Sequence, residues 1–280
     1  MRRNMVVLGN RSIQGSFGRI LSAGEIIIKD STIKSLYCAG DTDIKNSSAE
    51  KVRCAGDIDA SSTNFISFKA AGDVNLKGIC KAETAVITGS LNAELFQCNV
   101  LRNSSRNSKI NGVLEWSGGL QAETFESLYS FTLNCDYEFK NIISSAILNC
   151  NNEIVCENFY SFGGLSAQAL NAENIFILIN DDISLECIVG SNIRISNTFN
   201  PDKKFKNIPK SASYGKLAGS GNIIIVNVIE GDNIIIENTK SELVSGMDVF
   251  IGDLCIIEKV EYRNSVRISE KAVVNEVVKI

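Results

Sequence analysis

Cys38-Ala39-Gly40-Asp41, Cys54-Ala55-Gly56-Asp57 and Ala70-Ala71-Gly72-Asp73 are near copies of one tetrapeptide, spaced sixteen residues apart. Ala23-Gly24-Glu25 extends the series towards the N-terminus with the same spacing, so the glycines fall at 24, 40, 56 and 72. A short fixed period of this kind is typical of a solenoid, in which each repeat forms one coil that stacks on the previous coil.

Apolar and polar residues alternate within a repeat. The segment from Val52 to Ala60 has small or apolar residues at even positions and Arg53, Asp57 and Asp59 at odd positions. A period of two is the pattern of a half-buried strand and not of a helix. A repeat of sixteen or seventeen residues has room for about three short strands, and stacked coils lie about 4.8 Å apart. The sequence therefore predicts an all-β fold, a β-helix.

The Gly-Asp pairs predict the corners between these strands. Glycine tolerates a positive φ, and aspartate can hydrogen-bond to its own nearby backbone. On this reasoning a β-branched side chain at Gly56 should damage the corner, because it disfavours a positive φ. The predicted structural corner residues are Gly24, Gly40, Asp41, Gly56, Asp57, Gly72 and Asp73.

The repeat pattern divides the chain into four segments. Residues 1–12 read as an N-terminal tail, and residues 13–196 as the main β-helix. Residues 197–222 hold both prolines together with several lysines and glycines, a composition that indicates a linker or a protruding loop. Strand-like runs return after it, so residues 223–280 are predicted to form a second, shorter β-block.

Composition narrows the classes of function. The 280-residue chain carries a net charge of −4, which argues against a nucleic-acid partner, since such proteins need a basic surface. No apolar run is long enough for a membrane-spanning helix, and no secretory signal is visible, so the expected location is the cytoplasm. The nine cysteines are scattered singly through apolar segments, and we expect them to be reduced core residues.

The sequence offers no reaction centre. It contains no histidine, which excludes Ser-His-Asp and Cys-His arrangements and histidine-bearing metal triads. The acids at 41, 57 and 73 recur in register, and corner chemistry accounts for such a column better than general acid-base catalysis does. We therefore predict a protein that is not an enzyme and that uses no cofactor and no metal.

The N-terminus permits two interpretations. Arg2 and Arg3 precede the apolar run Met5-Val6-Val7-Leu8, and a basic pair beside apolar residues can contact an anionic membrane. One such anchor is weak and would need to be multiplied by assembly. The alternative is that this segment is the first strand of the solenoid or a frayed tail.

Several stretches resemble a known family. These are Gly15-Ser16-Phe17-Gly18-Arg19-Ile20 leading into Ala23-Gly24-Glu25, the Gly-Asp corners, and Val228 to Thr239 followed by Val249-Phe250-Ile251-Gly252 and Val260-Glu261-Tyr262. Together they resemble the bactofilin-like, polymer-forming cytoskeletal proteins of bacteria, in the two-block form found in Firmicutes. The resemblance implies a right-handed β-helix that joins end to end into filaments without nucleotide, often at the membrane, with other copies of itself as the main partner.

Two functions stay open after the sequence. The first is a bactofilin-like structural protein that self-associates end to end, since an uncapped strand edge is a template for another chain. The second is a monomeric β-helix adaptor that binds another protein or an envelope component. A carbohydrate-active β-helix enzyme is a third, weaker reading that the missing histidines and signal disfavour.

Overall fold

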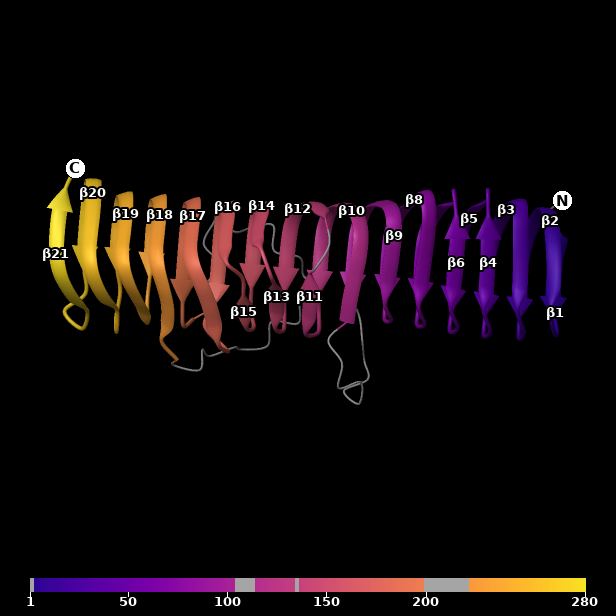
Figure 1. Cartoon of the computed structure of the whole chain (residues 1–280), viewed down its shortest axis with the longest axis horizontal. Helices are drawn as coiled ribbons and strands as arrows, with labels where there is room; N and C mark the ends of the chain where they lie inside the picture. The colour runs from indigo at the N-terminus through magenta and orange to yellow at the C-terminus, as the bar shows by residue number, and fades with distance from the viewer. Residues whose placement is uncertain (1–2, 104–113, 134–135, 199–221) are drawn as a thin grey trace. The chain divides into compact units, whose positions relative to one another are not determined.

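The structure, a computed structural model, describes residues 3–103, 114–133, 136–198 and 222–280. It is all-β, with 77% strand and no helix among these residues. The strands form a parallel β-solenoid of about 15 turns (Figure 1), which confirms the predicted fold class.

Twenty-one strands follow one another along the chain. They are β1 (Arg3–Val7), β2 (Arg11–Ser22), β3 (Ile26–Cys38), β4 (Thr42–Lys45), β5 (Ser48–Cys54), β6 (Ile58–Ser61), β7 (Asn64–Ala70), β8 (Val74–Ile87), β9 (Leu91–Asn103), β10 (Leu114–Ser127), β11 (Phe131–Leu133), β12 (Tyr137–Ser144), β13 (Leu148–Cys150), β14 (Glu153–Ser161), β15 (Leu165–Ser166), β16 (Ala169–Leu178), β17 (Ile183–Ser196), β18 (Ile224–Ile236), β19 (Thr239–Ile251), β20 (Ile256–Ile268) and β21 (Val273–Lys279).

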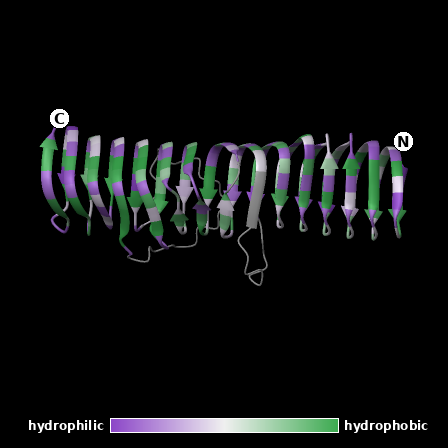
Figure 2. Cartoon of the chain, viewed as in Figure 1, coloured by the Kyte–Doolittle hydropathy of each residue, from purple (hydrophilic) through white to green (hydrophobic). Residues whose placement is uncertain are grey.

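The coils divide into two compact units. The N-terminal unit comprises residues 1–126 and 132–140, and the C-terminal unit comprises residues 127–131 and 141–280. Each unit is built of parallel strands whose side chains alternate between the interior of the coil and the solvent. Figure 2 shows this alternation as hydrophobic and hydrophilic bands along the strands.

Residues sixteen apart stack directly on one another in the N-terminal unit. Leu36 in β3 pairs with Val52 in β5, which in turn pairs with Phe68 in β7, and all three side chains are fully buried. Cys38 pairs with Cys54 and Cys54 with Ala70, as the sequence period predicts. Six of the eight cysteines that the structure describes are buried, in agreement with their expected place in the core.

The corner glycines are required for a different reason from the one that the sequence suggested. None of Gly24, Gly40, Gly56 and Gly72 has a positive φ. A Cβ atom on Gly56 would instead lie 2.7 Å from the carbonyl carbon of Gly40 in the preceding coil, and Gly72 stands in the same relation to Gly56. Close approach of successive backbones, and not left-handed conformation, excludes a side chain here.

The positive φ angles occur at another corner of the coil. Asp30, Asn46 and Ser62 have φ angles of 45°, 48° and 49°, and Gly78 continues the series at 63°. These four residues are again sixteen apart. Small polar residues tolerate the left-handed region better than most others, so this column needs no glycine.

The corner aspartates bond to the next coil and not to their own turn. Asp41 Oδ1 accepts a hydrogen bond of 3.0 Å from the backbone N–H of Asp57, and Asp57 Oδ1 accepts one of 2.8 Å from that of Asp73. Each carboxylate therefore ties one coil to its successor, and the predicted local Asp turn is wrong.

The N-terminal residues and the second block both join the coils. Residues 3–7, expected as tail, form β1, which pairs in parallel with β2. In the C-terminal unit, β17 pairs in parallel with β18 over ten registered residue pairs, so the strands that flank the expected linker are direct neighbours. Residues 199–221 of that linker, including its prolines and lysines, lie outside the described residues.

An asparagine ladder runs through the C-terminal unit. Side-chain hydrogen bonds link Asn158 to Asn141 (2.7 Å), Asn174 to Asn158 (2.9 Å), Asn192 to Asn174 (2.9 Å) and Asn233 to Asn192 (3.2 Å). In each step the amide N–H of one coil is donated to the amide oxygen of the coil before it. Such ladders satisfy half-buried amides and fix the register between coils.

Candidate functional site: the open strand edges

The solenoid coils leave strand edges without a described partner at both ends of the chain. Strand β1 pairs with β2, and β21 pairs with β20, and no strand in the described residues lies on the outer side of either. A free strand edge presents a row of backbone N–H and C=O groups that another strand can bind. These two edges are therefore the candidate binding surfaces of the solenoid.

The edge at β21 exposes side chains that belong inside a coil. Val277 pairs with Val260, which is fully buried, yet Val277 is 44% exposed. Ile268 at the end of β20 is 39% exposed, whereas its partner Ile251 is fully buried. Val274 is likewise half-buried above a buried isoleucine, Ile257. These residues face the coil interior like the buried residues with which they pair. They differ in having no further coil packed over them among the described residues.

The edge at β1 has a different character. Arg3 pairs with Phe17 and Arg11 pairs with Ile26, so two exposed arginines occupy places where the next coil carries buried apolar residues. Inward-register charges are a known device against edge-to-edge aggregation. The two edges are therefore unlike, and the apolar one is at β21.

The candidate membrane segment is divided by the fold. Val7 is buried and Met5 is partly buried, while Val6 and Leu8 are 64% and 83% exposed. Arg3 is exposed, and Arg2 lies outside the described residues. Because side chains alternate along a strand, Met5 and Val7 point towards the core. Val6 and Leu8 stay at the surface together with Arg3.

The remaining predicted site residues form no chemical centre. The corner residues Gly24, Gly40, Gly56 and Gly72 and their aspartates serve coil stacking, as described above. Among the described residues, no group of three or more cysteines, aspartates or glutamates is placed to hold a metal ion. In the same ranges, no helix is long and apolar enough to cross a membrane.

Sequence reasoning did not single out the β21 edge. Val273-Val274-Asn275-Glu276-Val277-Val278 alternates only loosely, and nothing in it differs from an inner strand. Only the stacking shows that its inward side is uncovered. Comparisons of the chain with known protein families, with curated proteins and with solved structures found no match.

Proposed function

We propose that this protein is a structural protein that self-associates through the ends of its coils into filaments or scaffolds. The β-solenoid fold is compatible with a structural or scaffold role. The observation that carries the proposal is the uncovered interior at β21, where Val277 and Ile268 are 44% and 39% exposed above fully buried counterparts. The resemblance to bactofilin-like proteins supports the same role.

The apolar area at this edge offsets part of the cost of association. Complete burial of a valine or isoleucine contributes about 1.5–3 kcal/mol, so covering a half-exposed one contributes about 1 kcal/mol. Where one copy covers this edge of the next, Val266, Ile268, Val274 and Val277 together contribute roughly 4 kcal/mol. Backbone hydrogen bonds along β21 add to this. The sum is comparable with the lower end of the cost of association, about 4–15 kcal/mol.

The proposal also includes a weak membrane contact and a location in the cell. Assembly would multiply weak membrane contacts from Arg3, Val6 and Leu8, which are exposed on the surface of each copy. A bactofilin-like role would place such assemblies in the cytoplasm, at the inner face of the membrane, without a cofactor or a catalytic step. Each contact of one basic residue with an anionic surface is worth about 1 kcal/mol, so a single copy would bind poorly.

Sedimentation over a concentration series, together with negative-stain electron microscopy, tests the proposal. The wild-type protein should form assemblies at tens of micromolar, and Val277→Lys should abolish them, because it places a charge in the coil interior at the edge. Ile66→Lys is the matched control: Ile66 is 48% exposed on the side of a coil, and Lys34 stands two coils earlier in the sixteen-residue register.

A wild-type protein that stays monomeric across ordinary salt concentrations would contradict self-association. It would favour the adaptor function instead, in which the coil surface binds another protein or an envelope component. Assembly that survives Val277→Lys would show that β21 is not the contact, and would leave the β1 edge as the candidate.

A further inference from the structure

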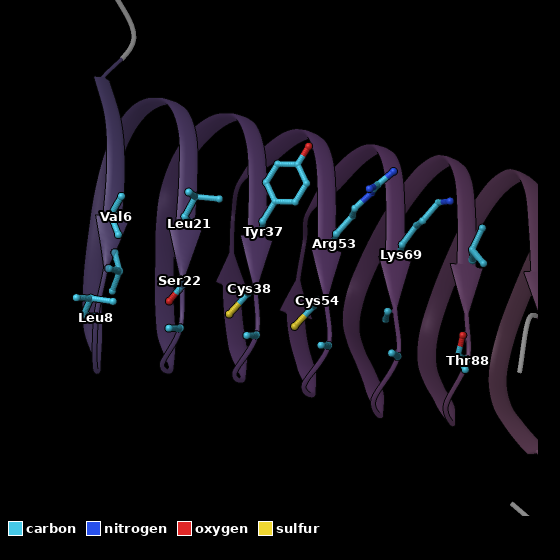
Figure 3. A pocket seen from close by; sticks show the side chains of 17 residues that line it. Val6, Leu8, Leu21, Ser22, Tyr37, Cys38, Arg53, Cys54, Lys69 and Thr88 are labelled. Atoms are coloured by element: carbon cyan, nitrogen blue, oxygen red, sulfur yellow. The ribbon is translucent and has the colours of Figure 1, made fainter. Parts of the chain in front are cut away.

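A groove crosses the coils of the N-terminal unit. It has a volume of about 870 Å³ and runs over strands β1, β2, β3, β5, β7 and β8. Figure 3 shows two of its rows: Leu21, Tyr37, Arg53 and Lys69 lie in one, and Ser22, Cys38 and Cys54 lie in the other. The corner alanines Ala23, Ala39, Ala55 and Ala71 form its third row. Small side chains in the second and third rows make the hollow.

Cations gather around a tyrosine at the centre of this groove. The guanidinium carbon of Arg19 lies 5.1 Å from the centroid of the Tyr37 ring, and that of Arg53 lies 5.9 Å from it. The Lys51 ammonium lies 6.0 Å from the same centroid, and Lys69 follows Arg53 in the next coil. Aromatic faces hold such cations by electrostatic attraction to the ring.

These cations have no acidic partner among the described residues. Within the part of the chain that the structure describes, no ion pair is found for Arg19, Lys51, Arg53 or Lys69. The chain as a whole is acidic, with a net charge of −4. Of these cations, Arg53 and Lys69 line the groove, and two positive charges without an acidic neighbour among the described residues favour an acidic occupant there.

A column of acidic corner residues in the same unit repeats once per coil, like the basic row of the groove. Glu25, Asp41, Asp57 and Asp73 are all exposed and follow each other one per coil, beside the alanines that border the groove. The hydrogen bond that each of Asp41 and Asp57 accepts uses Oδ1 and fixes the side chain, which leaves Oδ2 for another contact. Because both columns are built on the same coils, both repeat at the coil spacing of about 4.8 Å.

We propose that the groove binds the acidic corner column of a second copy of this chain, so that two N-terminal units lie side by side with parallel coil axes. The corner that carries Asp41, Asp57 and Asp73 projects next to the groove that carries Arg53 and Lys69. A two-fold axis parallel to the two coil axes therefore places the corner of each copy in the groove of the other copy. Every charge pair then occurs twice. This contact is separate from the end contact at β21.

Charge reversal in both directions tests the pairing. The measurements use full-length Val277→Lys protein, in which the end contact is disabled, and sedimentation velocity at low salt. We expect a monomer–dimer equilibrium whose Kd rises at least tenfold in the Arg53→Glu/Lys69→Glu variant and in the Asp57→Lys/Asp73→Lys variant. A 1:1 mixture of the two variants should restore the dimer, because each corner then meets a groove of opposite charge.

Two further variants separate charge from folding. Asp57→Asn/Asp73→Asn keeps the oxygen that accepts the backbone hydrogen bond but removes the charge, and it should raise the Kd while leaving the melting temperature unchanged. Lys29→Glu/Lys34→Glu changes the net charge by the same amount as the groove variant at exposed positions outside the groove, and it should leave the Kd unchanged.

Three results would overturn the proposal. The first is a Kd that the groove variant does not alter, and the second is a mixture of the reversed variants that stays monomeric. The third is a protein that is monomeric at every concentration yet binds an acidic polysaccharide through Arg53 and Lys69, which would assign the groove to an anionic polymer. End-to-end filaments of the wild type would persist in all three cases if the proposed function is right.

Discussion

Gly56 offers the sharpest test of how the coils stack. A Cβ atom at this position would lie 2.7 Å from the carbonyl carbon and oxygen of Gly40 and 2.6 Å from Asp41 Oδ1. Non-bonded carbon atoms in proteins normally lie about 3.5–4.0 Å apart. Alanine at position 56 therefore requires one coil to move away from the next, although its backbone conformation is one that any residue adopts.

The size of the effect follows from three contributions. Forcing a methyl group into a packed contact costs about 1–3 kcal/mol. Displacing Asp41 Oδ1 from the backbone N–H of Asp57, at 3.0 Å, removes a hydrogen bond worth about 0.5–1.5 kcal/mol. The reduced entropy of the unfolded chain offsets about 0.4–1 kcal/mol. We expect Gly56→Ala to lower the free energy of unfolding by about 0.5–4 kcal/mol, and Gly56→Val by more.

Thermal denaturation followed by circular dichroism measures this loss. Each kcal/mol corresponds to a shift of about 2–4 °C for a chain of this size. Gly78→Asn is the control: Gly78 has a φ of 63°, and Asn46 holds the same place two coils earlier with a φ of 48°. Its melting temperature should match that of the wild type. A Gly56→Ala protein that melts with the wild type, or a Gly78→Asn protein that melts well below it, would refute the stacking explanation.

Two further measurements address the ladder and the thiols. Asn174→Ala removes both the hydrogen bond that Asn174 donates to Asn158 and the one that it accepts from Asn192, so unfolding should become easier by about 1–3 kcal/mol in urea titration; the exposed Asn99→Ala should be neutral within about 0.5 kcal/mol. The neighbouring Cys54 thiol lowers the pKa of the Cys38 thiol, whereas burial raises the pKa of Cys98 to about 12. Cys38 in the native protein should therefore be alkylated at a lower pH than Cys98, which is about as buried and should stay unmodified up to pH 9. Equal labelling of both thiols at pH 7.5, read by mass spectrometry, would contradict the thiol assignment.

Local sequence predicted those features of this protein that depend on short-range alternation. The period of two in residues 52–60 and the spacing of the glycines were enough for a parallel β-solenoid, because a repeated short strand has few other ways to bury one side. The same reasoning placed Cys38 and Cys54 in the core, since Ala70 fills the equivalent small space. It failed on the cause of the Gly-Asp corners, because the distance from Gly56 to Gly40 is a property of two coils together.

The sequence by itself determined the repeat, the strands and the buried residue types, because each of these is encoded within about sixteen neighbouring residues. Only the tertiary structure decided which residues became neighbours across coils. It brought Asn192 beside Asn233 across the expected linker, gathered Arg19 and Arg53 at Tyr37, and left the inward side of Val277 uncovered. Stacking joins residues one full coil apart, and the number of residues in a coil changes along the chain. The groove and the open edge therefore become visible only after the coils are in place.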